Sequence, residues 1–157
     1  MTPIRVLVVD ADALARRALR DLLANVEGLE VCATAGNIVA GVVAVAEHDI
    51  DVVLMDARLG CDERLSAIRR IHEARSNARV LILSTSDDHE LGLRALRDNA
   101  AGFLSKDVHL DALGRIVHSL ARGEVVITRA MTATVIAEMR TLGPRRITAT
   151  RGLSTVG

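Results

Sequence analysis

Aromatic residues are almost absent from this chain of 157 residues. Phe103 is the only one, and neither Trp nor Tyr occurs. The core must therefore consist of Val, Leu, Ile and Ala, and the rings on which proteins stack bases or sugars are missing. The formal net charge is zero, and residues 124–157 carry only five basic against two acidic residues. These features argue against a nucleic-acid-binding surface in this chain.

Lysine and cysteine are also scarce. Nineteen of the 20 basic residues are arginine, so Lys106 is the only lysine. Because the two cations are not interchangeable beside a phosphate or carboxylate, we expect that a compact ammonium group is needed at this position. Cys32 and Cys61 lack metal-ligand spacing, and no segment resembles a signal peptide or an 18-residue apolar run. The sequence therefore predicts a cytoplasmic protein with free thiols and no membrane partner.

Five apolar runs alternate with amphipathic segments along the first 122 residues. The runs predict strands at residues 4–9, 29–35, 51–56, 79–85 and 101–106. Each is followed by a segment with the apolar spacing of a helix. Continuous apolar strands that alternate with helices indicate a parallel sheet covered on both faces. The length and the 50% apolar content suit one such α/β domain with a short extension.

Ligands of such folds bind at the carboxyl ends of the strands. The polar residues at these ends are Asp10, Asp12, Asp56, Ser84, Thr85 and Lys106. A carboxylate held rigidly at the rim of a dry sheet could attack an activated phosphoryl group, and Asp56 ends the most apolar strand. Carboxylates can hold Mg²⁺, while a lysine and a hydroxyl can contact the phosphoryl oxygens. The simpler interpretation, in which Asp56 only caps the next loop, does not account for the other polar strand ends.

Four segments together resemble the receiver domain of two-component response regulators, in particular the NarL/FixJ type. They are residues 5–23 (RVLVVDADALARRALRDLL), 51–59 (DVVLMDARL), 79–88 (RVLILSTSDD) and 100–107 (AAGFLSKD). The resemblance covers residues 3 to about 122. It implies a flavodoxin-like (CheY-like), doubly wound, five-stranded parallel sheet with strand order 2-1-3-4-5 and helices on both faces. Residues 1–122 would form the receiver domain, and residues 123–157 a linker helix and tail leading to a helix-turn-helix DNA-binding domain missing from this chain.

The resemblance also implies roles for individual residues. Asp56 would be the phosphoacceptor, and Asp10 an acid on the metal side. The backbone carbonyl of Arg58 would complete the metal site, in which Asp56 also takes part. Ser84 would be the switch hydroxyl, Phe103 the switch aromatic and Lys106 the phosphate-binding lysine.

One departure from the family pattern concerns the metal. Family members carry two adjacent acids after the first strand, and here the second is Ala11. Three interpretations remain open: a receiver with weakened Mg²⁺ binding, a pseudo-receiver with little or no Mg²⁺ that is controlled by a ligand or partner, and a site in which Asp12 is the substitute acid. Asp12 also has a simpler role, because Asp is a preferred N-cap of the helix that follows.

The expected function is that of a regulatory receiver in transcription, not of an enzyme with turnover. Its phosphoryl donor would be a sensor histidine kinase. Its partner in a homodimer would bind through the first and fifth helices, or through the face made by the fourth helix, the fifth strand and the fifth helix. A remote alternative is a haloacid-dehalogenase-like phosphohydrolase, with Asp10 as nucleophile and Asp12 as general acid, but this scheme leaves Asp56 without a role.

Overall fold

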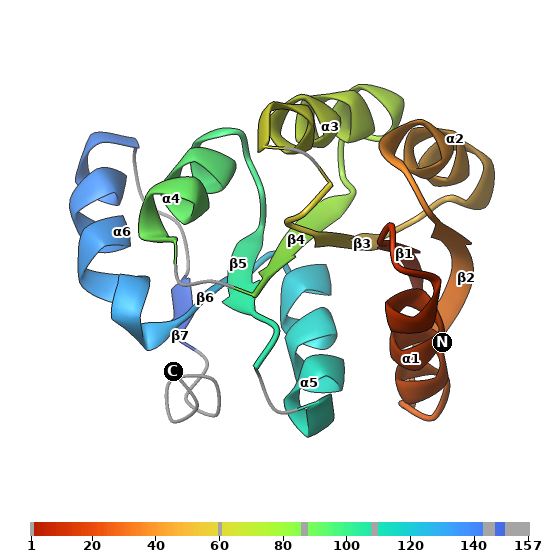
Figure 1. The fold of residues 1–157 in the computed structure, drawn as a ribbon. Coiled ribbons are helices and arrows are strands. Elements are labelled where there is room, and N and C mark those ends of the chain that lie inside the picture. The colour runs from red at the N-terminus through yellow and green to blue at the C-terminus, as the bar shows by residue number, and fades with distance from the viewer. Residues whose placement is uncertain (1, 60, 86–87, 108–109, 143–146, 150–157) are drawn as a thin grey trace.

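The computed structural model of the chain describes residues 2–59, 61–85, 88–107, 110–142 and 147–149. Strands and helices alternate along this part of the chain (Figure 1). The elements are β1 (Ile4–Val9), α1 (Ala13–Ala24), β2 (Leu29–Ala35), α2 (Ile38–His48), β3 (Val52–Asp56), α3 (Cys61–Ala74), β4 (Arg79–Ser84), α4 (His89–Arg97), β5 (Gly102–Ser105), α5 (Leu110–Ala121), β6 (Val125–Ile127), α6 (Arg129–Leu142) and β7 (Ile147–Ala149). No helix in the described residues has both the length and the apolar character required to cross a membrane.

All strands are parallel and form one sheet in the order β2-β1-β3-β4-β5-β6-β7. The expected order of the first five strands and the flavodoxin-like fold class are confirmed. The expected number of strands is wrong, because β6 and β7 extend the sheet to seven strands within the described residues. Each of these two strands has three residues, too few to show a period in the sequence, and pairing with the neighbouring strand defines them.

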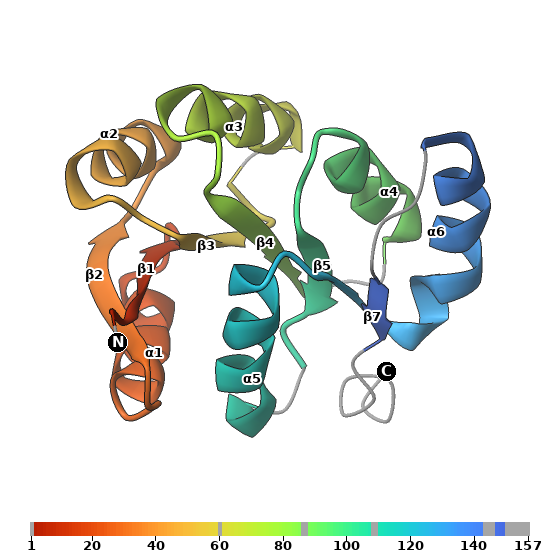
Figure 2. The same ribbon diagram turned by 180° about the vertical axis from the view of Figure 1, so that it is seen from behind.

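The helices cover both faces of the sheet (Figures 1 and 2). One apolar core contains buried side chains of α2, α3, α4 and α6, and the other contains those of α1 and α5. Both cores are built mainly from Val, Leu, Ile and Ala, and the core on the side of α4 and α6 also contains Met55, Met131 and Phe103. β3 is buried along its entire length, which explains its continuous apolar sequence.

Side chains at the helix starts fix where the helices begin. Asp12 caps α1 by accepting a hydrogen bond from the amide of Leu14, and Asn37 and Asp88 cap α2 and α4 in the same way. Each cap satisfies an amide that has no partner within its helix. These caps place the first turns of the helices just beyond the carboxyl ends of the strands, at the edge where the candidate site lies.

Helix α6 packs against α4, on the same face of the sheet. Met131 and Val135 of α6 are buried in the core shared with α4. Gly92 on α4 makes this contact possible, since a Cβ atom there would lie 2.6 Å from Cε of Met131 and 3.0 Å from Cδ1 of Phe103. Residues after position 122 therefore contribute to the core of this domain.

An ion pair also joins the exposed sides of α4 and α6. Nη2 of Arg97 donates to Oε1 of Glu138 at 2.7 Å. This hydrogen bond lowers the pKa of Glu138 and raises that of Arg97. The depressed pKa means that the pair stabilises the fold above the ordinary pKa of a glutamate, and that this contribution is lost as the pH falls through the lowered value.

Replacing Met131 by Ala tests whether α6 belongs to the domain. Met131 is 1% exposed, and we expect its truncation to lower the free energy of unfolding by about 2–4 kcal/mol. Ile136 on the same helix is 42% exposed, and its replacement by Ala, the matched control, should cost less than about 1 kcal/mol. Urea unfolding followed by far-ultraviolet circular dichroism measures both. Equal and small effects would show that α6 does not pack on the domain in solution.

Candidate functional site

Four polar residues from four strands meet at the carboxyl edge of the sheet. Asp10 follows β1, Asp56 ends β3, Ser84 ends β4 and Lys106 follows β5. The side chains of Asp10, Asp56 and Ser84 are almost fully buried, whereas the Lys106 side chain is 20% exposed. The structure thus brings together four of the six polar residues that the sequence singled out at the strand ends, whereas Asp12 and Thr85 are exposed.

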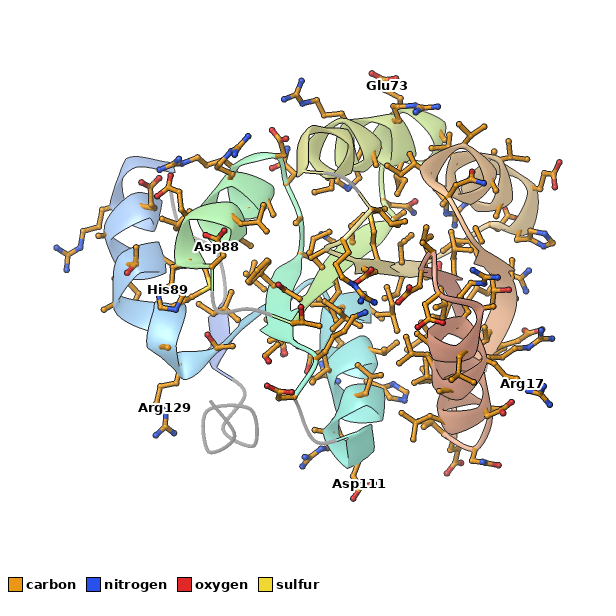
Figure 3. All side chains as sticks on the ribbon, in the orientation of Figure 1. Arg17, Glu73, Asp88, His89, Asp111 and Arg129 are labelled. Atoms are coloured by element: carbon orange, nitrogen blue, oxygen red, sulfur yellow. The ribbon has the colours of Figure 1, made fainter. Side chains whose placement is uncertain are left out.

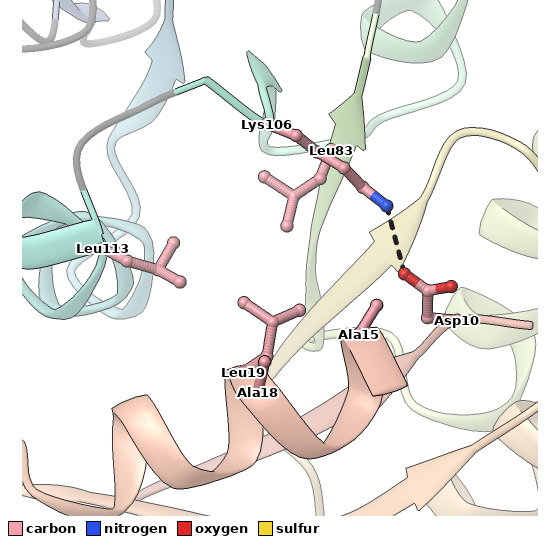
Figure 4. A pocket seen from close by; sticks show the side chains of 7 residues that line it. All are labelled: Asp10, Ala15, Ala18, Leu19, Leu83, Lys106 and Leu113. Carbon is pink, nitrogen blue, oxygen red and sulfur yellow. Dashed lines mark hydrogen bonds and ion pairs between the residues drawn. The ribbon is translucent and has the colours of Figure 1, made fainter. Parts of the chain in front are cut away.

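Lys106 binds both buried carboxylates. Its Nζ atom lies 3.1 Å from Oδ2 of Asp10 and 2.7 Å from Oδ1 of Asp56. The contact with Asp10 is shown in Figure 4. The backbone holds the lysine in place, because the amide of Lys106 donates to the carbonyl oxygen of Ser84. A single ammonium group therefore joins the ends of three strands.

The two oxygens of Asp56 have different surroundings. Oδ2 accepts a hydrogen bond from Nε of Arg58 at 3.1 Å. Oδ1 is buried and accepts no other hydrogen bond, and its partner is the ammonium group of Lys106, with which it forms an ion pair at 2.7 Å. The hydrogen bond to Asp56 raises the pKa of Arg58, and the charge of Asp56 adds to this effect. The Arg58 side chain itself is 56% exposed.

The carboxylate of Asp10 is fixed by its neighbours in the following loop. Oδ1 accepts a hydrogen bond from the amide of Asp12 at 2.9 Å, and Oδ2 faces Lys106. The backbone carbonyl of Asp10 accepts a second bond, from Nη1 of Arg16 on α1, at 2.6 Å. Neither this role of Arg16 nor the side-chain contact of Arg58 could be predicted, because arginines are common throughout the chain.

Ala11 and Asp12 lie on the solvent side of this loop and are both exposed. Oδ1 of Asp12 accepts from the amide of Leu14 at 2.9 Å and so caps α1. In this structure the Asp12 carboxylate caps α1, and the backbone amide of Asp12 donates to the carboxylate of Asp10. These contacts therefore indicate that Asp12 is a helix cap, and they do not support its role as a substitute acid.

Phe103 lies behind the site rather than in it. Its ring is 3% exposed and belongs to the core on the side of α4 and α6. Both Phe103 and Met131 come close to Gly92 of α4. The residue expected to act as the switch aromatic is thus next to the C-terminal helix.

A small apolar pocket opens beside the acids. It measures about 170 Å³ and lies between α1 and α5 (Figure 4). It is lined by Asp10, Ala15, Ala18, Leu19, Leu83, Lys106 and Leu113. Its polar end is the contact between Asp10 and Lys106, so the pocket belongs to the same site.

The donor set can be compared with the needs of Mg²⁺, which receiver domains generally bind. Mg²⁺ requires only one or two carboxylates besides water and phosphate oxygens, and Asp10 and Asp56 are of this type. Oδ1 of Asp56 is buried without a hydrogen bond and fits such a ligand. Within the described residues, however, no cluster of three or more metal-binding side chains occurs. These residues therefore fit Mg²⁺, but they supply one acid fewer than a family member that has two adjacent acids after the first strand.

Comparisons with known proteins agree with this geometry. The profile of the response regulator receiver domain matches residues 6–118. The nitrate/nitrite response regulator NarL of Escherichia coli is 26% identical over 88% of this chain and 64% of its own length. The transcriptional regulatory protein LnrK of Bacillus subtilis is 30% identical over 87% of this chain and 62% of its own length. The chain thus spans less than two thirds of these relatives.

Solved structures point the same way. The signal receiver domain of the NarL response regulator from Mycobacterium tuberculosis superimposes with a TM-score of 0.69 and 26% identity, covering 78% of this chain and 99% of that domain. The family profile spans most of the chain. The chain therefore belongs to the receiver domains of two-component response regulators, and NarL is among the regulators that it resembles.

Proposed function

We propose that Asp56 accepts a phosphoryl group and that this chain is the regulatory part of a transcriptional response regulator with weakened Mg²⁺ binding. The observation that carries this proposal is Oδ1 of Asp56, which is buried, makes no hydrogen bond and lies 2.7 Å from Nζ of Lys106. A carboxylate oxygen in this position is available as a nucleophile, and the lysine is placed to pair with the oxygens of an incoming phosphoryl group.

Receiver domains interact with histidine kinases, and we propose a phosphohistidine as the donor here. Bound Mg²⁺ would neutralise charge on the transferred group. Asp10 and Asp56, with the backbone carbonyl of Arg58, would hold the ion. Ser84 ends β4 beside the acceptor, and its hydroxyl would donate to a phosphoryl oxygen after transfer. Movement of this hydroxyl and of Phe103 would then pass the change in charge to the rest of the domain.

The weak binding of Mg²⁺ follows from Ala11, which stands where family members have a second acid. Asp10 and Asp56 remain, and Lys106 already lies against both of them. The number of charged ligands is one determinant of how tightly a site binds a divalent cation. An ion at this site therefore has fewer negative ligands and must share them with an ammonium group.

A phosphorylation-independent pseudo-receiver is the second candidate. The observation that favours it is that Lys106 and Arg58 together already balance the charges of the two carboxylates. In that case a ligand or partner, rather than a phosphoryl group, would set the state of the domain. The phosphohydrolase alternative has less support, because its general acid, Asp12, caps α1.

The partners follow from the same assignment. Receiver domains typically have no turnover of their own, and we propose none for this chain. We place the homodimer contact on α1 and α5, because α6 packs on α4 and covers part of the other candidate face. Because the relatives are longer and LnrK is named a transcriptional regulatory protein, we propose that DNA is bound through a domain outside this fold, in the cytoplasm, where response regulators typically act.

Incubation with acetyl phosphate and Mg²⁺, followed by intact-mass measurement, tests the acceptor. We expect slow and partial addition of one phosphoryl group, and no addition to the Asp56→Asn variant, whose fold is checked by circular dichroism. Addition to this variant would show that Asp56 is not the acceptor. Fast and complete addition to the natural chain would rule out both the weakened metal site and the pseudo-receiver.

Replacing Ala11 by Asp should raise the affinity for Mg²⁺ by about tenfold, because it restores a negative ligand next to Asp10. Ala13→Asp is the matched control, since it adds the same charge at an exposed position in the first turn of α1. Isothermal titration calorimetry measures the affinity of all three proteins. An unchanged affinity in Ala11→Asp would mean that the path of the loop, and not the missing acid, limits metal binding.

A further inference from the structure

The charges at the carboxyl edge of the sheet balance without a divalent ion. Asp10 and Asp56 are the buried carboxylates of the site. Lys106 contacts both of them, and Arg58 contacts Asp56. Two negative groups therefore face two positive groups within 3.1 Å, and both positive groups come from the chain itself.

The position of Arg58 explains how it reaches the acceptor. It lies two residues after Asp56, in a turn in which the amide of Leu59 donates to the carbonyl oxygen of Asp56. The turn brings the Arg58 side chain back over the end of β3. Nε then binds Oδ2 of Asp56, while Oδ1 of the same carboxylate stays with Lys106.

The guanidinium has donors left over for a second anion. Arginine carries five N–H donors in a planar fork that matches phosphate geometry, and Arg58 uses Nε for Asp56. With 56% of its side chain exposed, its outer nitrogens are reachable from solvent. Arginines that pair with a transferring phosphoryl group are a known means of stabilising its charge.

We propose that the Arg58 side chain is the resident cation of this site and supplies the charge that receiver domains take from Mg²⁺. The inference rests on the proposed function of Asp56 as phosphoacceptor. Arg58 holds Oδ2 of Asp56, orients Oδ1 toward the donor and binds an oxygen of the incoming phosphoryl group. The loss of the second acid at Ala11 and the presence of Arg58 are then two parts of one change, since each reduces the need for a divalent ion.

The step balances without a metal. With acetyl phosphate as donor, Oδ1 of Asp56 forms the new bond to phosphorus as the bond from phosphorus to the acetyl oxygen breaks. The products are an aspartyl phosphate and acetate, which leaves with the electron pair of the broken bond. No proton or electron is consumed, and the added negative charge lies between Lys106 and Arg58.

A purely structural ion pair is the competing explanation. Exposed ion pairs contribute little to stability, and the Arg58 side chain is largely exposed. Its partner carboxylate is only 1% exposed, however, and a buried carboxylate requires a partner. The two explanations differ in what the loss of Arg58 does to the metal dependence of the site.

The test compares the natural chain with Arg58→Gln, Arg58→Lys and Arg129→Gln. Arg129 is the matched control, since it is an exposed arginine in the first turn of α6, and Figure 3 shows it at the opposite side of the fold from α1. Each protein is incubated with acetyl phosphate in Mg²⁺ or in EDTA, and the phosphorylated fraction is followed by intact-mass measurement. Calorimetry measures the Mg²⁺ affinity of each unphosphorylated protein, because the chain has no Trp or Tyr to report binding by fluorescence.

We expect the natural chain and Arg129→Gln to keep most of their rate in EDTA, because the weakly bound Mg²⁺ adds little to the charge that Arg58 already supplies. Arg58→Gln should react about tenfold more slowly in EDTA, and Mg²⁺ should restore part of the rate. Its Mg²⁺ affinity should rise by about tenfold, since Oδ2 of Asp56 becomes free and a neighbouring positive charge is lost. Arg58→Lys, which keeps the charge, should lie between the two.

A natural chain that reacts much faster in Mg²⁺ than in EDTA would overturn the proposal, as would an Arg58→Gln variant that is unchanged in EDTA. If the natural chain gains no phosphoryl group in either condition, the assignment of Asp56 as acceptor fails. The Mg²⁺ titration then decides separately about Arg58. A raised affinity in Arg58→Gln supports the resident cation, and an unchanged affinity contradicts it.

Discussion

The contact of Lys106 with two buried carboxylates is the interaction on which the site depends. Asp10 and Asp56 follow neighbouring strands, so their charges lie close together at a dry edge of the sheet. Two such carboxylates repel one another, and a buried charge is costly without a partner of opposite charge. The ammonium group relieves both effects, and through its own strand it ties β5 to β1 and β3. The only lysine of the chain thus lies where a compact cation can contact two carboxylates at once.

Around this contact, the positive groups that face the buried acids are side chains of the protein itself. Asp10 is fixed by an amide, by Lys106 and, through its carbonyl, by Arg16. Asp56 lies between Lys106 and Arg58. In the proposed mechanism, such a site depends less on an ion from solution than one with three acids. The family membership establishes the kind of domain, and the contacts of Lys106 and Arg58 are the basis of that proposal.

The five central strands could be predicted because each is a continuous apolar run, and the site residues because they stand directly at the ends of those runs. β6 and β7 could not be predicted from the sequence, since three residues are too few to show a period. Pairing with the neighbouring strand defines them as strands. The apolar stripe of α6 is visible in the sequence, but its target on α4 depends on Gly92. The contact of Arg58 with Asp56 depends on the turn after β3, and residue types alone do not reveal how that turn directs a side chain.

The space above Gly92 links three positions that are distant in the sequence. Phe103 and Met131 both fill it, and any side chain at position 92 would compete with them. These three positions therefore affect one another. A relative that acquires alanine at the position of Gly92 has to move the flexible end of the side chain at 131, or carry a smaller residue there, to keep the contact between α4 and α6. Covariation among these three positions would mark the members of the family that keep their C-terminal helix against the receiver.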